Sequence, residues 1–121
     1  LFSTGDGHAR QGDGEVCVTA IECPREVTLR FTLQHDMPLT APRARTPEGW
    51  VTFGLHEDLN EAALLALEEM VGLLMSRDGL SRHAAFGLAS VLADLRVTQM
   101  VNGVCGVHAV LPHDAYTREQ A

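Results

Sequence analysis

Long apolar runs are absent from this sequence of 121 residues. No run reaches the roughly 18 residues that a membrane-spanning helix needs. A secretory signal would show a basic segment followed by an apolar one, and none is visible. We therefore expect no membrane partner. The first residue is Leu1 and not methionine, so we also expect the sequence to be part of a longer chain.

Basic residues and cysteines are scarce. Nine Lys and Arg stand against sixteen Asp and Glu, which gives a formal net charge of −7. An acidic surface repels phosphate backbones, so nucleic acid is not an expected partner. The three cysteines, Cys17, Cys23 and Cys105, form no close pair. They indicate no disulfide framework and favour a reducing, cytoplasmic compartment. We interpret all three as packing residues.

The rest of the composition is that of an ordinary globular protein, with 45% apolar and 21% charged residues. The length suits one compact domain over residues 1–121. No internal repeat or low-complexity tract divides it, and a single hydrophobic core is therefore expected.

The first half of the sequence predicts short strands. After a glycine-rich loop over residues 1–14, residues 15–22 read as a strand. The alternation of Val27, Leu29, Phe31 and Leu33 with polar residues predicts a half-buried strand over residues 27–34. We expect these two strands to form an antiparallel hairpin. A proline-rich connector then leads to a third strand at 50–55.

Two helices are predicted next. Asp58 with Glu61 three residues later is typical of a helix start, and Asp78-Gly79 ends this helix. Its apolar stripe is predicted to pack on the second helix and on the strand at 27–34; it consists of Ala63, Leu67, Met70 and Leu74. Ser81 is the predicted cap of the second helix, which presents Leu88, Val91, Leu92 and Leu95 to the core.

The second helix is predicted to run to Asn102-Gly103, and residues 104–111 to form a final strand. The fold class is therefore α+β, with short antiparallel β-strands followed by a helix pair and a final β-strand.

The densest polar cluster lies in residues 5–15, which carry Asp6, His8, Asp13 and Glu15 among four glycines. Glycine lets the backbone turn sharply, so the four side chains could converge in one pocket. Imidazole with carboxylate oxygens suits zinc or a similar divalent ion. A carboxylate that does not bind the metal could act as general base toward water. The alternative is a plain acidic loop, because Asp-Gly and Gly-Asp are common turn formers.

Three stretches carry a resemblance to a known family. The first is GDGHARQGDGEVC at 5–17, followed by TAIE at 19–22. The second is GLHEDLN at 54–60, before the acidic helix. The third is DLRVTQMVNGV at 94–104, followed by GVHA at 106–109. In this order they resemble the acetamidase/formamidase family over nearly the whole chain, up to about residue 112.

This resemblance implies amide hydrolysis by the C-terminal part of a larger, β-rich, metal-dependent enzyme that forms a homo-oligomer. Its N-terminal half would be a partner of this chain, and a small amide such as formamide or acetamide its substrate. Asp6, His8, Asp13 and Glu15 match the acidic signature. We assign Asp6 and His8 as metal ligands, Glu15 as the catalytic base and Asp13 as the next candidate for it.

Two departures from the family pattern stand in the signature. Val18 occupies a position where family members usually carry glycine, and Gly7 one where many carry proline. Neither removes a polar group, although Val18 could crowd a close backbone approach.

Two further polar residues lie in the third of these stretches. Gln99 could bind a substrate amide or tie its helix to the sheet, and His108 reads as a hydrogen-bonded structural residue. The functional alternative to an amidohydrolase is a non-catalytic packing or oligomerisation module, whose active site would need the N-terminal half.

Overall fold

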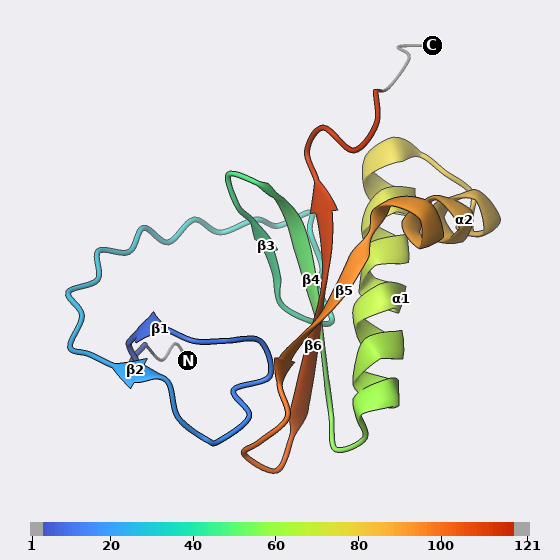
Figure 1. The fold of residues 1–121 in the computed structure, drawn as a ribbon. Helices are drawn as coiled ribbons and strands as arrows, with labels where there is room; N and C mark the ends of the chain where they lie inside the picture. Colours follow the sequence, from blue (N-terminus) through green and yellow to red (C-terminus); the bar gives the residue numbers. More distant parts are fainter. Residues whose placement is uncertain (1–3, 118–121) are drawn as a thin grey trace.

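The structure, a computed structural model, describes residues 4–117 and has an α+β fold, as predicted. Four strands form one antiparallel sheet in the order β3-β4-β6-β5. Both helices contact it from one side (Figure 1). The sheet and helix bounds are β3 Arg43–Arg45, β4 Gly49–His56, α1 Leu59–Asp78, α2 Arg82–Leu92, β5 Asp94–Gln99 and β6 Cys105–Pro112.

Two short strands, β1 (His8–Arg10) and β2 (Ile21–Glu22), pair separately from that sheet. They lie on the side of the sheet away from α1, where the chain also runs in a long arc from β2 to β3 (Figure 1). Within residues 4–117, no helix is long and apolar enough to cross a membrane.

Helix α1 forms as its capping residues predict. The Asp58 carboxylate accepts hydrogen bonds from the backbone N–H groups of Asn60 and Glu61. At the other end Gly79 is left-handed, with φ of 68°, and its N–H donates to the Met75 carbonyl. Both ends are therefore satisfied by the residues that the sequence indicated.

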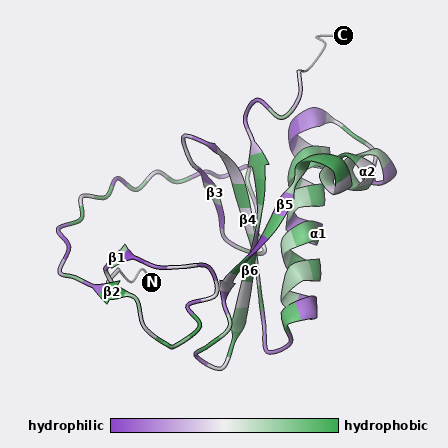
Figure 2. Ribbon diagram, in the orientation of Figure 1, coloured by the Kyte–Doolittle hydropathy of each residue, from purple (hydrophilic) through white to green (hydrophobic). Residues whose placement is uncertain are grey.

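The core lies between α1 and the sheet, where the ribbon is mostly hydrophobic (Figure 2). From α1 it takes Met70, Val71 and Leu74, and from β6 it takes Val107 and Leu111. The predicted stripe is confirmed for Met70 and Leu74, and its other two members are half-buried at the edge of the core.

The second helix is shorter than predicted. It ends at Leu92, and Asp94–Gln99 form strand β5 on the edge of the sheet. Pairing with β6 satisfies this backbone in the sheet, so tertiary context overrides the helical pattern. Leu88 and Leu92 pack at the core as predicted, whereas Val91 and Leu95 are exposed.

The predicted hairpin of residues 15–22 and 27–34 is wrong. Only Ile21–Glu22 form a strand in the first segment, and its partner is β1. The second segment has no regular structure, and the side chains of Val27 and Leu33 are 53% and 76% exposed. Alternation produces a strand only when an apolar layer covers it, and within the described residues none does. Leu29 therefore does not pack on α1.

Helix α1 and strand β4 approach each other closely. The buried Thr52 hydroxyl donates to the Ala66 carbonyl of α1 at 2.8 Å. At Gly54, an added Cβ atom would lie 2.0 Å from the Ala62 carbonyl oxygen and 2.5 Å from the Ala66 nitrogen. Both obstacles are helix backbone, so only glycine permits this packing distance.

This contact predicts opposite effects for two Gly→Ala substitutions. Gly54→Ala should lower the free energy of unfolding by about 1–3 kcal/mol, because α1 must move away from the sheet. Gly72→Ala, at an exposed α1 position with nothing within 4 Å of the added methyl group, should raise it by up to about 1 kcal/mol. Urea denaturation measures both. Equal effects would contradict the close-contact reading.

Candidate functional site

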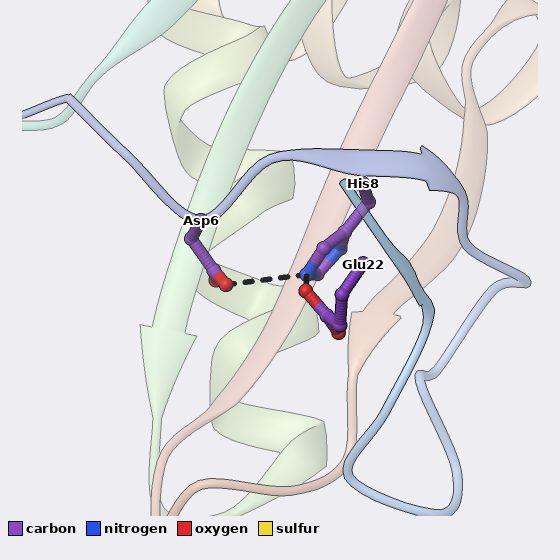
Figure 3. A group of neighbouring side chains, drawn as sticks. All are labelled: Asp6, His8 and Glu22. Carbon is purple, nitrogen blue, oxygen red and sulfur yellow. Dashed lines mark hydrogen bonds and ion pairs between the residues drawn. The ribbon is translucent and has the colours of Figure 1, made fainter. Parts of the chain in front are cut away.

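Asp6, His8 and Glu22 form a cluster at the β1–β2 pair. Asp6 precedes β1, His8 begins it, and Glu22 lies directly opposite His8 on β2. Figure 3 shows both carboxylates directed at the same imidazole. The His8 Nε2 atom lies 3.2 Å from Asp6 Oδ1 and 3.0 Å from Glu22 Oε2. The structure thus brings together the two predicted ligands and one residue that was not predicted.

The imidazole is the most enclosed member of the cluster. The His8 side chain is 14% exposed, against 88% for Asp6 and 56% for Glu22. The hydrogen bond with Gln11 contributes most to raising the pKa of His8, and the charges of Glu22 and Asp6 raise it further. The two carboxylates therefore form the solvent-facing side of the cluster.

The donor set fits a divalent cation. One ligand atom from each of the three residues lies within 4.8 Å of the others. Around a tetrahedral zinc ion with bonds of 2.0–2.2 Å, ligand atoms are about 3.3–3.6 Å apart. The observed separations from Nε2 are slightly shorter, so a small outward shift of the carboxylates would admit the ion. Three protein ligands with a solvent-facing side match a zinc site that keeps one position for water.

The other two predicted site residues do not join this cluster. Asp13 pairs with Arg96 of β5, with Oδ2 at 2.9 Å from Nη2 and 3.0 Å from Nε. Glu15 is half-buried, and its carboxylate makes no hydrogen bond or ion pair within the described part of the chain. The expected convergence of all four side chains is therefore not observed.

Tight turns, and not a strand, follow Asp13. Glu15 and Val18 are both left-handed, with φ of 44° and 67°. The Glu15 N–H donates to the Gly12 carbonyl, and the Val18 N–H donates to the Glu15 carbonyl. The strand predicted at residues 15–22 therefore forms only at Ile21–Glu22, and Cys17 is exposed where a buried thiol was expected.

The glycine loop is fastened to the outer edge of β5. The Gly14 N–H donates to the Val97 carbonyl at 2.9 Å, and the Gly14 carbonyl accepts from the Met100 N–H at 2.8 Å. In the strand order β5 pairs with β6 alone, so its other side is an outer edge of the sheet. The sheet thereby sets the position of the loop that carries the candidate residues.

Gln99 and His108 make structural contacts. The Gln99 amide nitrogen donates to the Val104 carbonyl at 2.7 Å and so closes the β5–β6 turn. His108 Nδ1 lies 2.7 Å from the Thr98 hydroxyl, which agrees with the predicted structural role. Burial and the nearby Arg96 charge lower the pKa of His108, so it is neutral at pH 7.

A hollow of 420 Å³ adjoins the cluster. Asp6 belongs to both, and Cys23, Arg25 and Val27 also line the hollow. The Arg25 guanidinium also donates to the His8 carbonyl, which connects the lining to β1. A molecule the size of acetamide could approach the cluster from this side.

Glu22 is the candidate residue that the sequence reasoning missed as a ligand. Its position four residues after Val18 suggested only the end of a strand. The signal that could have found it is the pair of glycines at Gly12 and Gly14, because a chain that doubles back there places residue 22 across from residue 8.

Comparisons with known proteins identify relatives. The sequence pattern of the Acetamidase/Formamidase family matches residues 1–118. The structure is similar to acetamidase from Bacillus halodurans, with a TM-score of 0.80 and 31% sequence identity over 87% of this chain and 36% of that one. It is also similar to acetamidase from Yersinia enterocolitica, with a TM-score of 0.77 and 27% identity over 91% and 34%. The chain spans about a third of the length of these relatives. No curated protein matches it.

The left-handed conformation of Val18 predicts a stabilising substitution. A β-branched residue is strained at positive φ, by about 1–2 kcal/mol. Val18→Gly should recover part of this energy and raise the melting temperature. Thr19→Gly, at a neighbouring exposed position whose φ is not positive, should lower it through added freedom of the unfolded chain. A loss of stability in Val18→Gly would show that its side chain contributes more than the turn costs.

Proposed function

Because this chain belongs to the acetamidase/formamidase family, we propose that it supplies part of the active site of an amidohydrolase. The enzyme cleaves the carbon–nitrogen bond of small linear amides such as formamide and acetamide, and its products are a carboxylate and ammonia. The membership first indicated by the three sequence stretches is confirmed by the match over residues 1–118.

The observation that carries the proposal is the group of Asp6, His8 and Glu22. In this proposal the imidazole Nε2 atom and one oxygen of each carboxylate hold a divalent ion, and zinc is the ion that this donor set suits. When bound, such an ion lowers the pKa of water and polarises a carbonyl group. The three side chains contribute by fixing where the ion can sit.

Glu15 lies outside the Asp6–His8–Glu22 cluster in this chain, and it is the proposed general base of the full-length enzyme. Its carboxylate has no partner among the described residues, whereas the Asp13 carboxylate is engaged by Arg96. In the reaction the oxygen of water bonds to the amide carbon, and Glu15 accepts the proton that water loses. The carbon–nitrogen bond then breaks, and the protonated Glu15 delivers that proton to the departing nitrogen.

The hollow beside Asp6 is the proposed approach for the amide. It is open to solvent and far larger than acetamide needs, so this chain alone sets no close limit on substrate length. Since the chain spans about a third of its relatives' length, further walls of the pocket are expected from the N-terminal half. The homo-oligomer and the cytoplasmic location remain predictions.

The proposed metal site predicts specific zinc binding. The chain should bind one zinc ion, and His8→Ala and Glu22→Gln should each weaken binding by more than the roughly 10–100-fold that an outer-shell partner costs. Asp13→Asn is the matched control, since Asp13 is paired with Arg96 and outside the group. Calorimetric titration with zinc measures all four. Equal affinity in all of them would favour the non-catalytic packing module.

The assignment of the base applies to the full-length enzyme. Glu15→Gln keeps the shape of the side chain and removes its basicity, so kcat should fall about 10²–10⁴-fold while metal content stays the same. Ammonia release from formamide and acetamide measures the activity. Cys17→Ala should retain activity. An active Glu15→Gln enzyme with an inactive Cys17→Ala enzyme would indicate covalent thiol catalysis instead.

A further inference from the structure

A second hollow, of 400 Å³, lies at the end of the molecule where β3 joins β4, α1 ends and β6 ends (Figure 1). Two arginines and three aromatic rings line it, namely Arg45, Trp50, Arg77, His113 and Tyr116. None of these residues belongs to the cluster at β1 and β2 or lines the hollow beside it. The volume lies within the roughly 300–1,000 Å³ that is usual for small-molecule sites.

Arg45 supplies an unpaired positive charge to this hollow. Arg45 and Trp50 are cross-strand partners in β3 and β4, and the guanidinium carbon lies 5.7 Å from the centre of the Trp50 ring. Contact with a ring face orients a guanidinium and leaves N–H donors for another partner. Within residues 4–117 the Arg45 guanidinium makes no hydrogen bond or ion pair. Its donors are therefore available to an acceptor that enters the hollow.

The counter-ion of Arg77 lies outside the lining. The Arg77 Nε and Nη2 atoms donate to the two oxygens of Asp78, each at 2.8 Å. The Tyr116 hydroxyl donates to the same carboxylate, whose side chain is only 5% exposed. Asp78 does not line the hollow, and neither does any other acidic residue of the described chain. An anion in the hollow thus meets two guanidinium groups and no carboxylate.

The rings of Trp50, His113 and Tyr116 give the hollow aromatic walls. The His113 ring meets the Trp50 ring edge-on, with their centroids 6.3 Å apart. The Arg77 guanidinium carbon lies 5.7 Å from the centre of the Tyr116 ring. Burial and the hydrogen bond to Asp78 raise the pKa of Tyr116, so it stays a neutral phenol at pH 7. The walls therefore add flat apolar surface and no negative charge.

We propose that this hollow is a binding site for a small carboxylate attached to a flat aromatic group. The planar fork of the Arg45 guanidinium matches the two oxygens of a carboxylate. The aromatic group of the ligand stacks on the rings of the lining. Since the chain has a net charge of −7, its field repels anions in general. Binding therefore depends on both contacts together, the guanidinium for the charge and the rings for the flat group.

Benzoate is the probe, and the single tryptophan of the chain is the reporter. The indole N–H of Trp50 gives one NMR signal, so its shift reports binding at this hollow directly. Acetate and benzamide are titrated in parallel, because acetate lacks the ring and benzamide lacks the charge. Benzoate should shift the signal saturably and bind at least about tenfold more tightly than either.

Two arginine variants test the assignment of the anion contact. Arg45→Met removes the guanidinium and keeps an unbranched side chain, so benzoate affinity should fall about 10–100-fold. Arg30→Met is the matched control, because it removes the same charge from an exposed position outside the hollow, and its affinity should equal that of the parent chain. Circular dichroism checks the folding of both variants.

The proposal is overturned by the absence of a saturable shift with benzoate, by an equal affinity for benzamide, or by an equal affinity in the parent chain and Arg45→Met. Tighter binding of inorganic phosphate than of benzoate would reject the carboxylate assignment. The comparison of the three ligands uses the parent chain alone, so it decides the matter even if Arg45→Met does not fold. No metal ion or amide hydrolysis is involved, so the outcome is independent of the proposed function.

Discussion

The close approach of α1 to β4 is the constraint on which the rest of the structure depends. Gly54 has no side chain, and Thr52 satisfies a helix carbonyl, so the helix backbone can lie directly on the strand. The core between α1 and β6 closes around this contact. With β4 and β6 covered by helix, β5 forms the edge on which the glycine loop docks through Val97 and Met100.

The candidate site consequently consists of turns and two very short strands, and contacts with the main sheet hold them in place. Both Asp6 and Glu15 are left-handed, and β1 and β2 together have only a few residues. Such conformations persist only where surrounding contacts determine them. Those contacts are the bonds of Gly14 to Val97 and Met100, the Gln11 bridge to Thr98 and the Arg25 bond to the His8 carbonyl. They connect the cluster to a fold shared with the acetamidases.

The charge distribution separates the roles of the acidic residues. Asp6 and Glu22 face an imidazole, Asp13 faces a guanidinium, and Glu15 faces no charged partner among residues 4–117. Neighbouring carboxylates in a sequence thus receive different surroundings from the sheet. In the proposed function, this division assigns Asp6 and Glu22 to metal binding, Asp13 to anchoring on Arg96, and Glu15 to the role of base.

The sequence by itself determined the features that depend on local interactions, namely the helix ends, the buried helix face and the family motif. Asp58 and Gly79 fixed α1, the Met70 and Leu74 positions identified its buried face, and the motif at 5–17 identified the family and two of the three clustered residues. Only the tertiary structure decided the rest. Residues 94–99 became a strand because β6 offers them a ladder, and the strand expected at 27–34 lacks a covering layer in the described chain. Glu22 meets His8 through cross-strand pairing. Strand pairing depends on partners and covering layers that lie outside each segment, so the residues of one segment do not specify it by themselves.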